Sequence, residues 1–518
     1  MPRSPSVGPP TGAAHVRSVA GLTGPTEALD SAPFFFAQKN GDEFVIRGQP
    51  TCQFGHRLPS RSAPVPDGVF AGWNWDGRAL DVEHDRYGLY PLFYYQRAGD
   101  FAISPSLVTL LREGAAPDVD ESALAVFLQL GFFIDDQTPF KHIKAVPPNL
   151  RFMWDGDLEI REHRDLGGRQ HVSRAEAVPI YAELFRQAVR RRVPSGQVVL
   201  PLSGGRDSRH ILLELCEAGI HPESCVTAIR YGRGNNDVDV AGMLARSFGL
   251  DHVVLERAPR LHAELQKNLA TSFCADEHAW LMPLAEHLNG RPVAIYDGIA
   301  GDVLSASLFQ KPAWLELYRA GRFVELAKTL VGKRRDGIVS LRRADARRLA
   351  DEALERIAVE LRRYGDATNP CTMFFFWNRT RREIALAPFG VLAGVETCFC
   401  PYLDHELYDF LTSLQPEITI DRTFHTDTIA LAHPSAQNVP YAAPGRRGLD
   451  ASLATFGAGV VAYGLRSGSR RGRMFSLLTA QLATGLAPRK GRRPSFSVDP
   501  DRLLYLLQLE DIQEAIRV

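Results

Sequence analysis

The segment Val198–Ser208 constrains the fold of this chain more than any other part of the sequence. A continuous apolar run, Val198–Leu202, leads through Ser-Gly-Gly into a stretch with helical spacing. Such a run, bounded by a glycine turn, is typical of a strand that is buried on both faces. Further apolar β-prone runs alternate with helical segments downstream, at Ser224–Arg230, Asp251–Leu255 and Pro292–Tyr296. This alternation predicts an α/β fold whose parallel sheet is covered by helices on both faces.

The chain before this region has a different pattern. Short β-prone runs broken by Gly, Asp and Pro fill residues 31–166, at Phe34–Ala37, Phe44–Arg47, Val69–Trp75 and Leu89–Tyr95. They predict a β-rich N-terminal domain. Beyond Asp302 the pattern is mostly helical. We therefore expect a flexible leader over 1–30, a β-rich domain over 31–166, an α/β domain over 167–445 and a helical, basic extension over 446–518.

Charge and cysteine usage narrow the class of protein. The 60 Lys and Arg residues balance the 60 Asp and Glu residues, so general nucleic-acid binding is not expected. No apolar run approaches the ~20 residues that span a bilayer, and the N-terminus lacks the apolar core of a secretion signal. The seven cysteines form no Cys-x-x-Cys pair. We expect reduced thiols in the cytoplasm and no structural zinc site.

The turn after the first buried strand carries phosphate-binding chemistry. Gly204 and Gly205 allow a positive φ and a close approach of the backbone to a ligand, so that amide N–H groups can face phosphate oxygens. Ser203 and Ser208 can donate hydroxyl hydrogen bonds, and Asp207 can hold a Mg²⁺ ion. The alternative is an ordinary strand–helix turn that contains two glycines.

These residues resemble the SGGxDS pyrophosphate loop of the ATP-pyrophosphatase group. Four further segments resemble landmarks of the asparagine synthetase family, in the family's order: Asp85–Tyr95, Thr138–Pro148, Asp297–Asp302 and Pro401–Leu407. The resemblance covers roughly residues 33–445. It implies an N-terminal domain of the N-terminal-nucleophile type, a parallel sheet of the adenine-nucleotide α-hydrolase type and a helical C-terminal extension.

The resemblance also implies an activity and a set of site residues. Members of the family use ATP and Mg²⁺ to adenylate a carboxylate, and an amine then displaces AMP to form an amide. By position, Ser203, Gly204, Gly205, Asp207 and Ser208 would bind pyrophosphate, Ile229 and Gly298 would flank adenine, and Asp207 and Asp302 would hold Mg²⁺. Asp237 takes the position of a family acidic residue or, alternatively, of a helix N-cap.

The chain departs from the family in its N-terminal domain. Glutamine-hydrolysing members use a cysteine exposed by removal of the initiator Met, whereas Pro2 follows Met1 here and the first cysteine is Cys52. The chain between Cys52 and Val69 leaves too little room for glutamine-binding loops. We therefore expect an inactive glutaminase-like domain, as in the β-lactam and lasso-peptide macrolactam synthetases that the chain most resembles.

A second departure concerns the acid–base group. Ile299 stands where asparagine synthetase has Glu and β-lactam synthetases have Tyr, and it cannot take a proton. Glu396 is the candidate base, although a surface Glu fits its position as well. Arg446 and Arg447 are candidates for the cation that stabilises the transferring phosphate. His210 is expected on a helix surface, and residues 378–382 on a solvated helix face, with a substrate-binding role for Arg379 or Arg382 as the alternative.

The sequence thus predicts an ATP- and Mg²⁺-dependent, AMP-forming amide synthetase without glutamine hydrolysis. Closure of an amide within a small-molecule or peptide substrate is the favoured version. Amidation of a small acid with ammonia, and nucleotide binding without catalysis because of Ile299, are the alternatives. No nucleic acid and no membrane span are expected, and a partner protein or a homodimer is left open.

Overall fold

The computed structural model describes most of the chain. The described residues are 32–41, 43–60, 65–149, 151–156, 158, 166–230, 236–332, 346–443, 452–466 and 500–517. The predicted leader over 1–30, the candidates Arg446 and Arg447, and nearly all of the basic stretch at 466–493 lie outside these residues.

Two antiparallel sheets form the N-terminal part of the structure. One has the order β2-β1-β7-β6-β8 and the other β3-β4-β5-β9. Their bounds are β1 Phe35–Asn40, β2 Glu43–Gly48, β3 Thr51–Leu58, β4 Asp67–Trp75, β5 Leu80–His84, β6 Phe93–Arg97, β7 Asp100–Ser104, β8 Ile143–Ala145 and β9 Arg151–Trp154. The two sheets pack face to face through a buried cluster that includes Phe35 and Phe101 from the first sheet and Trp73 and Trp154 from the second.

Strands β3, β5 and β7 have no counterpart in the sequence prediction. In β3 and β5 more buried positions alternate with more exposed ones. Polar residues at the exposed positions interrupt the apolar pattern by which a strand is recognised in the sequence. β7 is a short partner of β1 and β6. The predicted strand Leu89–Tyr95 begins only at Phe93, because Leu89 and Tyr90 form a turn whose N–H groups donate to the Asp85 carboxylate.

A five-stranded parallel sheet forms the second part, which confirms the predicted α/β class. Its order is β12-β11-β10-β13-β14, and each neighbouring pair is parallel. The bounds are β10 Gln197–Pro201, β11 Ser224–Ala228, β12 His252–Leu255, β13 Val293–Tyr296 and β14 Thr397–Phe399. The chain runs outward from β10 to β12 and returns with β13 on the other side of β10. The loops after β10 and β13 therefore flank a topological switch point, where such sheets bind ligands.

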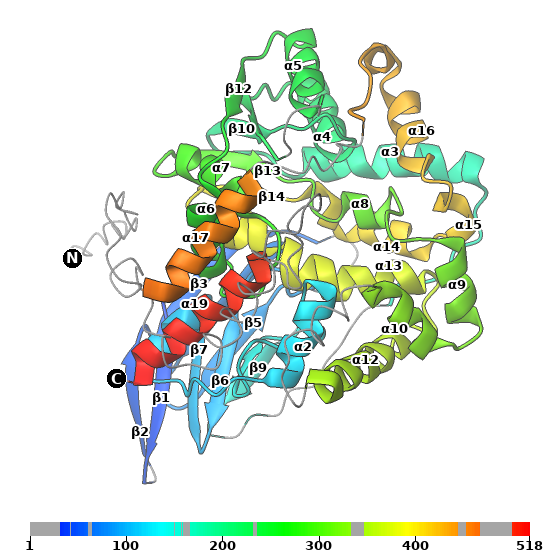
Figure 1. Cartoon of the computed structure of the whole chain (residues 1–518). Helices are drawn as coiled ribbons and strands as arrows, with labels where there is room; N and C mark the ends of the chain where they lie inside the picture. The colour runs from blue at the N-terminus through cyan, green and yellow to red at the C-terminus, as the bar shows by residue number, and fades with distance from the viewer. Residues whose placement is uncertain are drawn as a thin grey trace, which may run out of the picture.

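Helices cover the parallel sheet and link it to the antiparallel sheets (Figure 1). Two helices near the C-terminus, α17 and α19, lie side by side across α6. The α-helices are α1 Leu107–Arg112, α2 Glu121–Leu130, α3 Arg174–Arg190, α4 Asp207–Glu217, α5 Asp237–Ser247, α6 Arg260–Ala270, α7 Met282–Leu288, α8 Gly301–Leu304, α9 Pro312–Arg319, α10 Phe323–Val331, α12 Ala346–Arg362, α13 Pro370–Phe374, α14 His405–Ser413, α15 Pro416–Thr419, α16 Phe424–Ala432, α17 Ser452–Arg466 and α19 Pro500–Arg517. Two π-helical segments, η2 Phe375–Ile384 and η3 Ala387–Val391, follow α13. Among the described helices, none combines the length and apolar character needed to cross a membrane.

Candidate functional site

The loop between β10 and α4 closes on itself through its serines. Ser203 N–H donates to Ser208 Oγ at 3.0 Å, and Gly205 N–H donates to Ser203 Oγ at 3.2 Å. Helix α4 begins at Asp207, and no side chain caps its N-terminus. An uncapped first turn presents amide N–H groups and the positive end of the helix dipole, the combination that binds anionic oxygens.

Gly204 is required by close packing and not by its backbone conformation. A Cβ atom there would lie 2.7 Å from the Cβ of Ala442 and 3.0 Å from the Cβ of Val240. Neither Gly204 nor Gly205 has a positive φ, so the prediction of left-handed glycines in this loop is wrong. The 442–443 segment lies directly against the loop, since Ala442 N–H donates to Gly204 O at 3.0 Å.

Asp237 connects this loop to α5. The Gly204 N–H donates to Asp237 Oδ1 at 2.8 Å, so this loop amide already binds a carboxylate oxygen. Asp237 is the first residue of α5, and Asn236 takes the N-cap position. The N-cap alternative for Asp237 is therefore wrong. Its carboxylate instead faces the loop, on the side of β11.

The loop after β13 packs directly on Asp207. A Cβ atom at Gly301 would lie 2.4 Å from Asp207 Oδ1, and one at Gly298 would lie 2.7 Å from Asp207 Cβ. Only glycine allows this approach at both positions. The turn is held by Ile299 N–H, which donates to Asp297 Oδ1 at 2.7 Å, and Ala300 has a φ of 73°. Two predicted loops that lie far apart in the sequence thus meet at the carboxyl edge of the sheet.

Three carboxylates share this edge. Burial, together with the charges of Asp302 and Asp297, holds the pKa of Asp207 well above its usual value. Burial also raises the pKa of Asp297 to about 6 and raises the pKa of Asp302 against the pull of Arg379. Asp207 Oδ1 is buried and has no hydrogen-bond partner, although the side chain as a whole is 29% exposed. Clustered carboxylate oxygens with an unsatisfied buried member fit a hard divalent cation such as Mg²⁺. Asp297 belongs to this cluster as well, a role that its sequence motif does not indicate.

Two arginines and a glutamate lie on the Asp302 side of the loops. Arg379 and Arg230 are close enough to lower the pKa of Asp302, against the dominant effect of burial, and Glu277 raises it. Arg230 Nη2 lies 2.9 Å from Glu277 Oε2, and Arg379 Nη2 lies 3.6 Å from Glu277 Oε1. Glu277 is about one-third exposed, at 36%, so this cluster reaches the surface beside the carboxylates.

The predicted solvated face at residues 378–382 is wrong, since even Arg379, the least buried of them, has a side chain only 15% exposed. Arg381 is buried and donates to Asp136 Oδ1 at 2.6 Å, and Arg382 is buried and donates to Gln137 O at 2.6 Å. Both arginines therefore tie η2 to the loop before β8, and Arg381 Nη2 also donates to Val146 O, just after β8, at 2.9 Å. Arg379 alone of the three points to the Asp302 side.

His210 is also not on a helix surface. Its side chain is fully buried, and its Nδ1 lies 3.2 Å from Nε2 of His425. His425 in turn places Nδ1 3.5 Å from Asp207 Oδ1, and burial lowers the pKa of His425 to about 3. An uncharged His425 therefore borders the carboxylate cluster. The surface prediction failed because a second helical layer, α3 and α16, covers this face of α4.

The other predicted site residues divide by position. Ile229 follows β11 at the carboxyl edge, where its N–H donates to Leu255 O at 3.1 Å. Ile299 is buried in the turn after β13. Glu396 is exposed and precedes β14, and Ser195 Oγ donates to its Oε1 at 3.4 Å. Since Ser195 precedes β10, Glu396 lies at the amino edge of the parallel sheet. It is thus not brought to the loops, and the structure offers no catalytic role for it.

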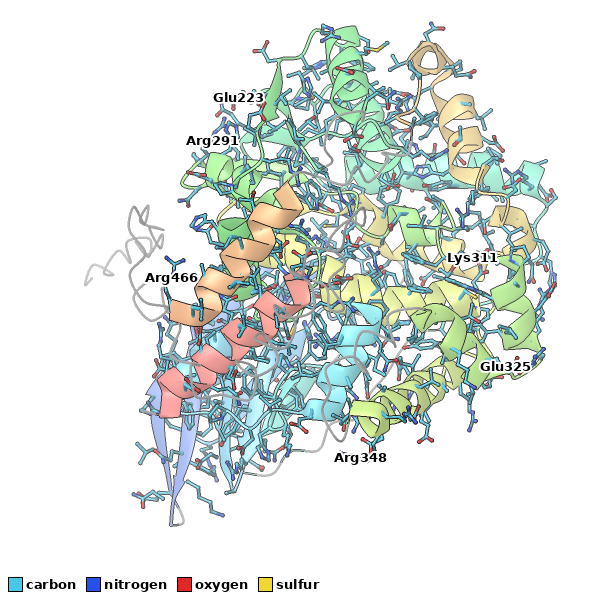
Figure 2. The ribbon with its side chains drawn as sticks, viewed as in Figure 1. Glu223, Arg291, Lys311, Glu325, Arg348 and Arg466 are labelled. Atoms are coloured by element: carbon cyan, nitrogen blue, oxygen red, sulfur yellow. The ribbon has the colours of Figure 1, made fainter. Side chains whose placement is uncertain are left out.

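The amino edge also carries an ion pair, in which Arg291 Nη2 lies 3.1 Å from Glu223 Oε1 (Figure 2). Glu223 precedes β11 and Arg291 precedes β13, so this pair lies at the opposite end of the strands from Asp207. The antiparallel part offers little chemistry by comparison. Cys52 in β3 donates its thiol to Gln49 Oε1 at 2.9 Å, and burial raises the pKa of Cys52.

Comparison with known proteins assigns a class to part of the chain. Residues 60–163 match the model of a glutamine amidotransferase domain. A solved glutamine phosphoribosylpyrophosphate (PRPP) amidotransferase from B. subtilis, complexed with ADP and GMP, is similar at 10% identity over 45% of this chain, with a TM-score of 0.12. This chain spans about half of that structure's length, 49%, and a TM-score this low supports no argument about fold or site. No curated protein matches the chain. The chain thus contains a region of the glutamine amidotransferase class, the class that serves C–N bond formation.

Proposed function

We propose that this protein is an asparagine synthetase-like ligase that uses ATP and Mg²⁺ to adenylate a carboxylate, and then forms an amide without hydrolysing glutamine. The observation that carries the proposal is the contact between the 203–208 and 297–302 loops. There Asp207, Asp297 and Asp302 converge, and Asp207 Oδ1 is buried without a hydrogen-bond partner. This arrangement follows a buried parallel strand at a switch point, where nucleotides commonly bind.

The first loop supplies the groups for the phosphates. The hydroxyls of Ser203 and Ser208 and the uncapped start of α4 would hold the pyrophosphate end of ATP. Asp207 and Asp302, with Asp297 beside them, would hold Mg²⁺. When bound, this ion supplies charge screening between the phosphates and the approaching carboxylate.

The chemistry consists of two transfers. A substrate carboxylate oxygen attacks the α-phosphorus, and the bond to pyrophosphate breaks. An amine nitrogen then attacks the acyl carbon, AMP leaves with the bonding electron pair, and the amine gives up a proton. We propose that Arg379 and Arg230, which both pair with Glu277, bind the substrate's carboxylate. In this proposal Glu277, instead of Glu396, is the carboxylate that receives the amine or its proton. Arg446 and Arg447 come three and four residues after Ala443 in the sequence. They remain the candidates for the cation that stabilises the transferring phosphate.

The nitrogen source is proposed to be an amine within the substrate. The thiol of Cys52 points to Gln49 and has a raised pKa, which gives it little nucleophilic character at neutral pH. Closure of an amide within one substrate needs no ammonia from a glutaminase.

Calorimetry with Mg²⁺ and a non-hydrolysable ATP analogue tests the site. We expect the wild-type protein to bind the nucleotide and Asp207→Asn to weaken that binding by at least ~10²-fold, because one metal carboxylate is lost. Glu223→Gln is the matched control: it removes a carboxylate at the opposite edge of the same sheet and should leave binding unchanged.

A second measurement separates the reaction types. Exchange of labelled pyrophosphate into ATP, tested across candidate acids, identifies the carboxylate, and AMP release with and without ammonia distinguishes intermolecular from intramolecular amide formation. Nucleotide binding without AMP from any acid would favour the non-catalytic alternative that the buried Ile299 suggests. Equal binding by Asp207→Asn and the wild type would refute the proposed site.

A further inference from the structure

A second cluster of metal-type ligands lies behind the phosphate loop. His210 and Glu214 are one turn apart on α4, and His433 is the C-cap residue of α16. His433 Nε2 lies 2.9 Å from Glu214 Oε1, His210 Nε2 lies 4.0 Å from the same oxygen, and one ligand atom from each residue lies within 4.8 Å of the other two. All three side chains are buried, at 0%, 1% and 8% exposed for His210, Glu214 and His433.

The remaining polar atom of each side chain has an outer partner. His210 Nδ1 lies 3.2 Å from His425 Nε2, and His433 Nδ1 lies 3.3 Å from Glu217 Oε2. Glu214 Oε2 lies 3.4 Å from Arg186 Nε. Both imidazoles are therefore held by Nδ1 with Nε2 facing inward, and the carboxylate is held by one oxygen with the other facing inward. This is the arrangement that outer-shell partners impose on the ligands of a bound metal ion.

A second observation concerns His210 itself. Its Nε2 is buried and has no hydrogen-bond partner. An unsatisfied nitrogen in a fully buried side chain is destabilising unless something binds it. Because His210 Nδ1 already faces His425, Nε2 is the nitrogen left to bind a ligand.

We propose that His210, Glu214 and His433 form a binding site for a transition-metal ion of the Zn²⁺ class, separate from the Mg²⁺ cluster at Asp207. Two imidazole nitrogens and one carboxylate oxygen are a ligand set that zinc accepts and that magnesium, which prefers oxygen, disfavours. Bonds of about 2.0–2.2 Å require only small side-chain movements from the spacing seen here. The ion would fasten α4 to the end of α16. The proposal does not depend on the function proposed above.

An alternative without metal is that His433 bonds directly to two carboxylates. Its nitrogens lie 2.9 Å from Glu214 Oε1 and 3.3 Å from Glu217 Oε2. That arrangement leaves His210 Nε2 buried and unpartnered, whereas a metal ion satisfies it. The cysteine spacing, from which the sequence analysis expected no structural zinc, carries no information about a site built from histidine and glutamate.

The test measures metal content and metal-linked stability of the full chain. Protein stripped with a chelator is titrated with Zn²⁺ in the presence of excess Mg²⁺, and binding is followed by competition with a chromophoric chelator. We expect one tight Zn²⁺ per chain and a higher melting temperature with Zn²⁺. Replacement by Co²⁺ should give the intense visible absorption of a tetrahedral site.

The variant His433→Gln should lose at least ~10-fold in Zn²⁺ affinity and lose the Zn²⁺-dependent rise in melting temperature. His262→Ala removes an exposed histidine on α6 and is the matched control, so it should behave as the wild type. Glu214→Gln is a second variant with the same expected loss, in case His433→Gln folds poorly. The proposal is overturned if the stripped protein binds no Zn²⁺, or if both variants bind it as the wild type does.

Discussion

The antiparallel and parallel parts of this molecule differ in what their residues can do. The region that matches a glutamine amidotransferase domain, residues 60–163, adds its strands to a core rich in Phe, Trp and Tyr, and the nearby Cys52 is a hydrogen-bonded thiol with a raised pKa. The parallel sheet instead gathers Asp207, Asp297 and Asp302 at one edge, where burial raises their pKa values. Similarity to a known family and the capacity for chemistry thus lie in different parts of the chain.

A buried arginine joins the two parts. Arg192, which follows α3, has a side chain 1% exposed. Its Nη2 lies 3.0 Å from both carboxylate oxygens of Asp67 at the start of β4, and its Nη1 lies 2.9 Å from Asp404 Oδ2 beside α14. One guanidinium therefore connects the antiparallel sheet to the helices around the parallel sheet. Substituting Arg192 therefore tests how strongly the two parts depend on each other for stability.

The largest effect is expected from Arg192→Ala. Removing the cation leaves the buried Asp67 carboxylate without its guanidinium partner, whereas Asp404 keeps its pair with Arg191. Breaking a buried ion pair in this way costs about 3–5 kcal/mol of unfolding free energy. Urea unfolding followed by fluorescence measures this loss. Arg151→Ala is the control, because it breaks an exposed pair with Asp81 and should cost less than about 1 kcal/mol. A loss from Arg192→Ala no larger than that of the control would mean that this residue does not hold the two parts together.

The next effect concerns the contact between the two loops. In Gly301→Ala the new Cβ would lie 2.4 Å from Asp207 Oδ1, so Asp207 must move. A displacement of about 1 Å at a catalytic group costs on the order of 10²-fold, and we expect that loss in Mg²⁺–nucleotide affinity measured by calorimetry. Gly168→Ala, where a Cβ meets nothing within 4 Å, is the control. Unchanged affinity in Gly301→Ala would separate the loop contact from nucleotide binding.

Much of this edge could be predicted from the sequence. Asp207, Gly298 and Asp302 occur in short motifs after apolar runs, and a parallel sheet brings such loops to one edge. Glu396 was misplaced because β14, only three residues long, has too little periodicity to be recognised. Once β14 is known, a residue just before it belongs at the amino edge. Arg230, Glu277 and His425 join the site through tertiary packing between distant segments, which no local pattern reports.

A smaller effect is expected from the charge of the carboxylate cluster. Folding raises the pKa of Asp207 and of Asp297 above their unfolded values, so the folded state binds more protons and stability falls as the pH rises. For Asp297, whose pKa is raised to about 6, this fall spans about pH 4 to pH 6. Asp207→Asn should therefore stabilise the nucleotide-free protein by on the order of 1 kcal/mol at neutral pH, and by little at pH ~4.

Thermal unfolding at these two pH values, without Mg²⁺, measures the difference. Asp366→Asn is the control, because it removes an exposed carboxylate in a turn for which no such gain is expected. Destabilisation by Asp207→Asn at neutral pH would mean that the three carboxylates do not repel one another in the folded protein.

The smallest effect is expected from a substitution in the antiparallel part. Cys52→Ala removes a thiol of β3 that donates to Oε1 of Gln49, a residue before that strand, and whose pKa is raised by burial. A thiol becomes a nucleophile only as the thiolate, so this cysteine is poorly suited to attack glutamine at neutral pH. We expect no change in AMP formation, and no release of glutamate from glutamine by either the wild type or the variant.

Cys216→Ala, which removes a half-buried thiol from α4, controls for non-specific effects of losing a cysteine. If the wild type hydrolyses glutamine and Cys52→Ala alone abolishes that hydrolysis, the antiparallel part has kept its own chemistry, and the contrast between the two parts of the molecule fails.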